Sequence, residues 1–305
     1  MKILLTGANG QLGWELQRTA PASIEIAAFG SRELDITDYQ AVERMVVACR
    51  PEVIINAAAY TAVDQAEQDS ERAFQVNGLA AANLAQVARE GGMRLVHIST
   101  DFIFDGCKSS PYRPDDSPNP LGVYGRSKLL GEERILAITK GLDTTIIRTA
   151  WVYSSHGHNF VKTMLRLMRE RESLAVIADQ IGTPTWAQGL AQAVWAVVLQ
   201  GLSGIYHWTD AGVASWYDFA MAIMEEAHTL GLLTKRPVLR PIPASDYPLP
   251  AARPSFSVLD KTSLWQAIDS TPSHWRVELR KMLGEMQSMS TSKTKMQPAR
   301  DTDLD

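Results

Sequence analysis

Short apolar runs alternate with helically spaced apolar positions along the first half of the chain. The runs predict five strands, at residues 2–6, 24–29, 53–56, 94–99 and 144–148. Between them, apolar residues spaced three and four apart predict helices near 11–19, 38–48, 70–91 and 123–139. Near-continuous apolar strands separated by helices are typical of a parallel sheet whose two faces are both covered. The pattern therefore predicts an α/β fold with a doubly wound parallel sheet.

Beyond residue 150 the pattern becomes less regular. It predicts helices at 159–172, 183–200, 215–230 and 275–287, with further strands at 174–178 and 205–208. We expect residues 1–150, joined by about 174–208, to form a large first domain, and residues 151–173 and 209–287 to form a smaller lobe. Residues 288–305 are polar and free of aromatic side chains, so we expect a disordered tail there.

Composition narrows the range of functions. Of 305 residues, 45% are hydrophobic and 21% are charged, which is ordinary for a globular protein. A net charge of −4 gives no electrostatic argument for nucleic-acid binding. No apolar run approaches the ~18–20 residues that span a bilayer, and the start does not resemble a signal peptide. Two cysteines make neither a disulfide framework nor a metal set. We therefore expect a cytoplasmic protein that binds neither nucleic acid nor membrane.

A glycine-rich turn follows the first predicted strand and opens the first predicted helix. Gly7, Gly10 and Gly13 are spaced three residues apart across that turn. In a Rossmann unit, such glycines let the backbone approach a pyrophosphate, and the helix N–H groups point at it. The spacing is GxxGxxG rather than the more usual GxGxxG. Glycine clusters also occur in plain turns, but the position between strand and helix favours dinucleotide binding.

A second motif lies far downstream. Tyr124 and Lys128 are four residues apart, hence on one face of the predicted helix at 123–139. Such a pair occurs by chance on many helix surfaces. It becomes specific when it is joined to the N-terminal glycines, the strand end at 98–100 and the small-residue stretch at 56–59.

This combination resembles the extended short-chain dehydrogenase/reductase family. The resemblance implies a Rossmann domain at 1–150, a C-terminal substrate lobe, and three catalytic residues, Tyr124, Lys128 and Thr100. Tyr124 would exchange a proton with the substrate oxygen, and Thr100 would hydrogen-bond the same oxygen. A free phenol titrates near ~10, and we expect the neighbouring Lys128 ammonium to lower the pKa of Tyr124. Lys128 would also donate hydrogen bonds to the nicotinamide ribose.

Residues that follow the strands supply the expected cofactor site. After the second strand, Arg32 stands where an NAD enzyme holds a carboxylate for the ribose 2′-hydroxyl. Arg32 could receive a 2′-phosphate, which favours NADPH with NADH possible, or it is a solvated loop arginine. The cofactor-binding residues that we expect are Gly7, Gly10, Gln11, Leu12, Gly13, Arg32, Asp35, Ile36, Ala57, Ala58, Ala59, Thr61, Tyr124 and Lys128.

Further stretches resemble the nucleotide-sugar reductases of this family. They lie at 10–16, 56–64, 99–106, 124–128, 148–153, 159–166, 179–185 and 252–254. The resemblance implies reduction of the 4-keto group of dTDP-4-dehydro-L-rhamnose to dTDP-L-rhamnose, with Thr100, Asp101, Trp151 and Arg253 on the substrate. Trp151 suits stacking on a sugar, or alternatively core packing. Arg253 could hold the diphosphate through a bidentate contact, or form an ion pair within its loop.

The sequence also departs from the family pattern. Phe102 stands where a tyrosine is common, which removes a hydroxyl near the substrate. Some relatives bind magnesium through carboxylates at a dimer interface. Here Glu15 is present, but Gln188 replaces an expected acid, and a neutral oxygen is a poorer Mg²⁺ ligand. We therefore assign no metal residues, leave Mg²⁺ open, and expect a possible homodimer.

Two rival functions share these motifs. A nucleotide-sugar epimerase or 4,6-dehydratase of the same family recycles a tightly held NAD. Dehydratases usually follow the threonine with Asp-Glu, whereas Phe102 follows Asp101 here. A non-catalytic subunit resembling the regulatory beta subunit of methionine adenosyltransferase is the second rival. A pure scaffold has no need to keep Thr100, Tyr124 and Lys128 together, so a reductase is favoured.

Overall fold

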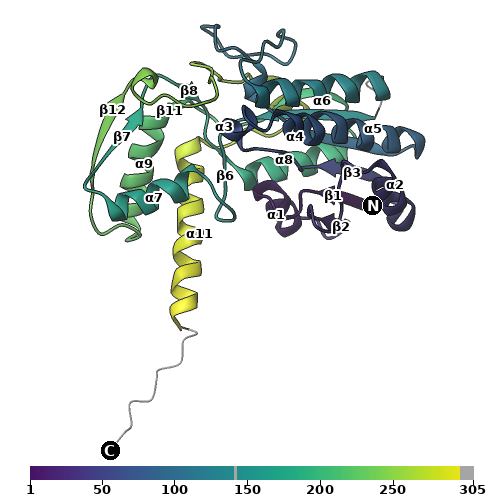
Figure 1. The fold of residues 1–305 in the computed structure, drawn as a ribbon. Coiled ribbons are helices and arrows are strands. Elements are labelled where there is room, and N and C mark those ends of the chain that lie inside the picture. Colours follow the sequence, from purple (N-terminus) through teal and green to yellow (C-terminus); the bar gives the residue numbers. More distant parts are fainter. Residues whose placement is uncertain (141–142, 296–305) are drawn as a thin grey trace, which may run out of the picture.

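The computed structural model describes residues 1–140 and 143–295, and its centre is a six-stranded sheet (Figure 1). The strand order is β10-β5-β4-β3-β1-β2, and every neighbouring pair is parallel. The strands are β1 (Lys2–Thr6), β2 (Glu25–Phe29), β3 (Val53–Asn56), β4 (Arg94–Thr100), β5 (Thr144–Thr149) and β10 (Gly204–His207). The predicted α/β fold with a doubly wound parallel sheet is confirmed.

Side chains of the central strands alternate between two cores, one on each face of the sheet. In β1, Ile3 and Leu5 pack on one face, while Leu4 packs on the other. The first face is covered by α1 (Gln11–Arg18), α8 (Ala187–Gln200) and α10 (Thr262–Ala267). The second is covered by α2 (Tyr39–Cys49), α5 (Ala80–Glu90) and α6 (Val123–Thr139). Figure 1 shows α5 and α6 on the side opposite to α1 and α8.

The helix predicted at 70–91 is divided by a π-helical turn. It consists of α4 (Ser70–Phe74), the π turn η1 (Gln75–Leu79) and α5, and the short helix α3 (Val63–Ala66) precedes it. Asn77 lies in the π turn and is buried. Its amide accepts from Tyr60 N (2.9 Å) and donates to Tyr60 O (3.0 Å) and Ser127 Oγ (3.0 Å). The turn therefore ties the loop after β3 to α6, as π turns often do near functional sites.

A second apolar core lies beside the sheet, among three helices (Figure 1). These are α7 (Phe160–Glu170), α9 (Trp216–Thr229) and α11 (Trp275–Lys295). Three two-stranded pairs border them: β6 (Val152–Tyr153) with β9 (Thr185–Trp186), β8 (Ile181–Gly182) with β11 (Ala214–Ser215), and β7 (Ser173–Ile177) with β12 (Val238–Ile242). The 3₁₀ turns η2 (Asp101–Ile103) and η3 (Ala244–Asp246) complete the elements.

Two expected boundaries differ from the structure. Residues 174–178 were expected to join the large domain, but β7 pairs with β12, and its Leu174 and Val176 enter the second core. Their alternation with exposed neighbours is the pattern of a strand with one covered face, not of a central parallel strand. Only α8 and β10 from the stretch 174–208 cover or extend the main sheet.

The expected disordered tail begins too early. Helix α11 continues to Lys295, so residues 288–295 are helical, and 296–305 lie outside the described residues. The first turns of α11 are anchored by Leu279, Met282 and Leu283, which are fully buried. Once a helix is nucleated, each further residue adds one backbone hydrogen bond, so polar residues can prolong it. Among the described helices, none combines the length and apolar character needed to cross a membrane.

Candidate active site

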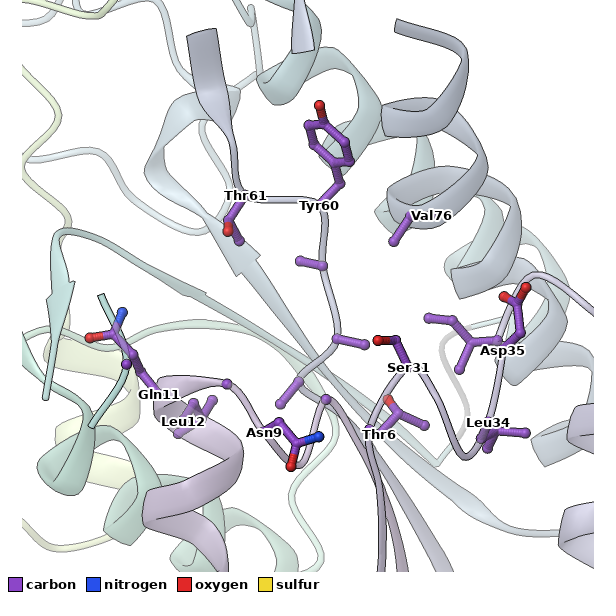
Figure 2. A pocket seen from close by; sticks show the side chains of 18 of the residues that line it. Thr6, Asn9, Gln11, Leu12, Ser31, Leu34, Asp35, Tyr60, Thr61 and Val76 are labelled. Atoms are coloured by element: carbon purple, nitrogen blue, oxygen red, sulfur yellow. The ribbon is translucent and has the colours of Figure 1, made fainter. Parts of the chain in front are cut away.

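A pocket of about 700 Å³ opens at the carboxyl ends of β1, β2 and β3. Figure 2 shows Gln11 and Leu12 of α1 on one side of it and Leu34, Asp35 and Val76 on the other. Its walls are formed by Thr6, Gly7, Asn9, Gly10, Gln11, Leu12, Gly30, Ser31, Leu34, Asp35, Ile36, Thr37, Ala57, Ala58, Ala59, Tyr60, Thr61, Arg72, Val76, Val152, Gly157 and His158. This is the position at which open parallel sheets bind their ligands.

The predicted glycines build the floor of the pocket. Gly7 has φ +74°, and a Cβ there would lie 2.5 Å from Ala58 N, in the loop after β3. A Cβ on Gly13 would lie 2.1 Å from the Gly7 carbonyl oxygen, so Gly13 supports the turn from beneath without lining the pocket. Gly10 is the N-cap of α1 and carries no side chain to occupy the first N–H groups of that helix. Those donors are free to bind an anion such as a diphosphate.

Most of the other expected cofactor residues also lie on the pocket wall. They are Gln11, Leu12, Asp35, Ile36, Ala57, Ala58, Ala59 and Thr61. The Asp35 carboxylate accepts hydrogen bonds from Thr37 N (2.9 Å) and Thr37 Oγ1 (2.7 Å). These two bonds lower the pKa of Asp35, and the positive charge of Arg72 contributes. The carboxylate is therefore held in a fixed position on the wall.

The basic residue on the wall is Arg72, not the expected Arg32. Arg32 is exposed and is absent from the described residues that line the pocket, whereas Ser31 and Arg72 are present. Arg72 comes from α4, and no hydrogen bond or ion pair of its guanidinium occurs among the described residues. The residues at the strand ends do not reveal Arg72, because α4 begins several residues after the loop that follows β3. Val76, one helical turn after Arg72, also lines the pocket and was not expected for the same reason.

Tyr124 and Lys128 lie on α6, outside the pocket wall. The Tyr124 ring meets Phe102 edge to face, with ring centroids 5.6 Å apart. Burial raises the pKa of Tyr124 to about 12, a hydrogen bond with Thr100 opposes this rise, and the charge of Asp101 adds to it. The expectation that Lys128 lowers the pKa of Tyr124 is therefore wrong for the ligand-free chain. Burial of the phenol sets the direction of the shift, and Lys128 is not among the groups that change this pKa.

Lys128 is almost completely buried and points towards the sheet. Its Nζ donates to the carbonyl oxygen of Ile98 at 2.6 Å and lies 3.3 Å from His97 Nε2. Burial lowers the pKa of Lys128 to about 8, against a smaller opposing effect of Glu132. From His97 a chain of hydrogen bonds runs through Asn56 to Thr6, which lines the pocket. Side chains thus link Lys128 of α6 to the wall of the pocket.

Thr100 ends β4 and Asp101 begins η2, and both act on the pKa of Tyr124. The Thr100 hydroxyl donates to Asp101 Oδ1 at 3.1 Å and accepts from the Phe102 N–H at 3.3 Å. Asp101 is buried, and its Oδ2 has no hydrogen-bond partner among the described residues. Burial raises the pKa of Asp101 to about 6. An unpartnered buried carboxylate oxygen indicates a place where a polar ligand group is accommodated.

The two other expected substrate residues are engaged with protein groups. Trp151 stacks on Trp216 with ring centroids 3.5 Å apart, which agrees with the alternative of core packing. Arg253 forms a bidentate ion pair with Asp64, through Nη2–Oδ2 (2.7 Å) and Nη1–Oδ1 (3.0 Å). Any diphosphate that Arg253 binds has to compete with the Asp64 carboxylate.

The carboxylate considered for magnesium is also engaged. Glu15 is fully buried, accepts from Arg18 (2.6 Å) and Ser154 (2.9 Å), and Arg18 in turn contacts Glu285. Within the described part of the chain, no three His, Cys, Asp or Glu side chains are grouped as a metal site requires. Residues 1–140 and 143–295 of a single chain therefore show no set of magnesium ligands, and Mg²⁺ stays open.

Comparison with known proteins gives consistent matches across the chain. The family model described as RmlD substrate binding domain matches residues 1–288. A dTDP-4-dehydrorhamnose reductase of Burkholderia thailandensis is 43% identical, covering 90% of this chain and 96% of the relative. A dTDP-4-keto-6-deoxy-D-glucose reductase of Streptomyces niveus is 40% identical, covering 90% and 94%.

The solved structures agree. The crystal structure of dTDP-4-dehydrorhamnose reductase from Bacillus anthracis, in complex with NADP, superposes with a TM-score of 0.88 at 35% identity. The superposition covers 93% of this chain and 99% of the Bacillus anthracis chain. With a family model that spans nearly the whole chain and relatives above 40% identity, the chain belongs to the dTDP-4-dehydrorhamnose reductase family of extended short-chain dehydrogenases/reductases.

Proposed function

We propose that this chain is an oxidoreductase that uses NADPH to reduce the 4-keto group of dTDP-4-dehydro-L-rhamnose, giving dTDP-L-rhamnose. The observation that carries the proposal is the pocket built by Gly7 and the first turn of α1, to which His97 and Asn56 link Lys128. Membership of a family of such reductases, one of them solved with NADP, supports the same function.

The pocket fits a dinucleotide along its length. The N–H groups at the start of α1 would hold the diphosphate, because Gly10 leaves them uncapped. Asp35 and Ile36 would contact the adenine, and Ser31 and Arg72 would meet a 2′-phosphate at the same end. The nicotinamide cofactor, when bound, supplies the hydride. We assign the 2′-phosphate to Arg72 because it lines the pocket and Arg32 does not.

Tyr124 is suited to donate a proton at neutral pH. With a pKa of about 12, its phenol stays protonated in the ligand-free enzyme. As a carbonyl is reduced, negative charge develops on its oxygen, and the phenol can give its proton to that oxygen. Thr100, hydrogen-bonded beside Tyr124, would donate to the same oxygen and stabilise the developing charge.

The lobe around the second core would bind the nucleotide sugar. In this part of the proposal, Asp101 offers its unpartnered Oδ2 to a sugar hydroxyl, Trp151 closes the pocket, and Arg253 exchanges Asp64 for the diphosphate. The Phe102 side chain presents no hydroxyl to the substrate. The residue division between the Rossmann domain and the lobe is part of the same proposal, with β7 moved to the lobe.

The surroundings of the enzyme complete the proposal. We place it in the cytoplasm, where reduced thiols persist, in agreement with two free cysteines, Cys49 and Cys107.

We also propose a homodimer. Helix α11 projects from the body of the molecule, and Val277 and Met289 are exposed on it (Figure 1). Sedimentation of the purified protein at micromolar concentration tests the dimer, and a monomer at every concentration would exclude it.

A deuterium experiment separates the reductase from its rivals. NADPH that carries deuterium at the transferred position is mixed with enzyme and dTDP-4-dehydro-L-rhamnose. The reductase places one deuterium at C4 for each NADPH oxidised, as measured by NMR of the product. An epimerase recycles its own hydrogen and gives no net oxidation of NADPH. Running dTDP-4-keto-6-deoxy-D-glucose in parallel ranks the sugar named for the Streptomyces niveus relative.

A further inference from the structure

The orientation of the Asn56 side chain is fixed by a backbone group. Its Oδ1 accepts from the Ala58 N–H (3.1 Å) and from Thr6 Oγ1 (2.8 Å). A backbone N–H can only donate, so the atom that faces it must be the amide oxygen. The other atom of the amide, Nδ2, lies 3.0 Å from His97 Nδ1 and must donate to it. His97 Nδ1 therefore accepts a hydrogen bond and carries no proton.

This hydrogen bond fixes the tautomer of His97. The imidazole is completely buried, and burial places its pKa well below the ordinary value. The ring is thus neutral at neutral pH and carries one proton. Since Nδ1 is an acceptor, that proton lies on Nε2. The Nε2–H group lies 3.3 Å from Lys128 Nζ.

A charged Lys128 is poorly matched to these surroundings. An ammonium has only donors, so it would face the Nε2–H of His97 donor to donor. A neutral amine instead has a lone pair for Nε2–H and hydrogens for the Ile98 carbonyl. Only 2% of Lys128 is exposed, and no carboxylate lies within 4 Å of its Nζ among the described residues. A buried ammonium without such a partner is strongly destabilising.

The other titratable groups around Lys128 do not restore its charge. On its own helix, Tyr124 and Glu132 lie one turn to either side, and His97 faces it from β4. Glu132 favours the ammonium, but its carboxylate is already bound to the Arg148 guanidinium of β5 at 2.7 Å. The attraction left for a second cation is correspondingly small.

We propose that His97 presents its Nε2–H to Lys128 and so destabilises the ammonium form of this lysine in the ligand-free enzyme. His97 and Asn56 are then positioning residues, which act through Lys128. Asn56 selects the His97 tautomer, and the tautomer shifts the balance of the lysine towards its neutral amine. The functional value of this arrangement rests on the proposed reductase activity.

The arrangement explains how Tyr124 can be returned to its protonated form. After the phenol has given its proton to the substrate oxygen, it is a phenolate and needs another proton. A lysine whose ammonium is destabilised gives up its proton readily, so Lys128, one helical turn from Tyr124, can return a proton to the phenolate and become the neutral amine. An ordinary lysine, with a pKa near ~10.4, is almost always charged at pH 7. Its ammonium would be a weaker acid and would give up its proton to the phenolate less readily.

Nuclear magnetic resonance of the ligand-free protein tests the proposal directly. With ¹⁵N-labelled histidine, the six histidines report which ring nitrogen carries the proton, and loss of one set in His97→Gln assigns His97. We expect Nε2–H for His97 at pH 7. With lysine labelled at ¹³Cε, the signal lost in Lys128→Met assigns Lys128. We expect it to titrate at least one pH unit below the ordinary lysine value.

Two variants at the far end of this chain of hydrogen bonds test whether Asn56 controls His97 and Lys128. In Asn56→Asp the carboxylate can only accept, so His97 should move its proton to Nδ1 and present Nε2 as an acceptor to Lys128. We expect both the tautomer and the lysine titration to shift, the latter to higher pH. Thr6→Val is the matched control, because the Ala58 N–H still fixes Asn56 and both signals should stay in place.

An Nδ1–H tautomer in the wild-type protein, or a Lys128 that titrates at the ordinary value, would overturn the proposal. An unchanged His97 tautomer in folded Asn56→Asp would overturn it as well. None of these measurements needs substrate, cofactor or turnover. They therefore fail independently of the proposed reductase activity, which the deuterium experiment decides.

Discussion

Removing the Arg72 side chain should weaken binding of NADPH and leave binding of NADH almost unchanged. Arg72 lines the adenosine end of the pocket with Ser31, and no ion pair among the described residues occupies its guanidinium. A hydrogen bond between charged groups contributes about 1.5–3 kcal/mol. Arg72 is exposed, and exposed charges are screened by water and salt, so the lower end of that range applies. We expect Arg72→Ala to raise the Kd for NADPH roughly tenfold.

Fluorescence titration of the reduced nicotinamide measures both dissociation constants. Arg32→Ala is the matched control, because Arg32 is also an exposed arginine near this end of the sheet but does not line the pocket. Arg72→Lys keeps the charge without the planar fork and should lose only part of the affinity. The reasoning fails if Arg32→Ala loses NADPH affinity while Arg72→Ala retains it, or if NADH binding falls equally in Arg72→Ala.

Two further predictions concern the glycine turn and the buried lysine. Gly7→Ala should reduce NADPH affinity more than tenfold, because its Cβ would lie 2.5 Å from Ala58 N; Gly231→Ala, with nearly the same φ of +71° and open space around it, controls for backbone strain in the same titration. Burial lowers the pKa of Lys128 to about 8, whereas a lysine in the unfolded chain titrates near ~10.4. Between pH 8 and pH ~10.4 the unfolded chain therefore binds a proton that the folded chain has lost. Rising pH in this range should stabilise the fold. Thermal unfolding at pH 8 and pH 10 should show this gain in the wild-type protein relative to Lys128→Met; equal pH dependence in both would contradict it.

Most of the fold could be predicted from local patterns. The strands β1, β3 and β5 are short runs of apolar residues bounded by polar ones, and their parallel order follows from the helices between them. Gly7 and Gly13 were predictable because a strand-to-helix turn at a sheet edge permits few side chains. Chemistry that depends on backbone conformation and on sequence spacing is therefore visible in the sequence itself.

The rest depends on contacts between distant segments. The pairing of β7 with β12 joins residues more than sixty positions apart, and no local period specifies that partner. Arg72 lies on α4, beyond the loop after β3 and the short helix α3, and local spacing does not show that this helix returns to the pocket. The pKa of Tyr124 was expected in the wrong direction because spacing showed the nearby cation, whereas burial depends on the packed structure.

Consumption of NADPH by wild-type enzyme and Tyr124→Phe tests the central claim most directly. Loss of the reduced-nicotinamide absorbance is followed with dTDP-4-dehydro-L-rhamnose present, and NADPH affinity is measured for both proteins. We predict stoichiometric, sugar-dependent oxidation by the wild-type enzyme, and turnover at least 10²-fold lower in Tyr124→Phe with affinity nearly unchanged. Full turnover in the variant, or no sugar-dependent oxidation by wild-type protein that binds NADPH, would contradict the account.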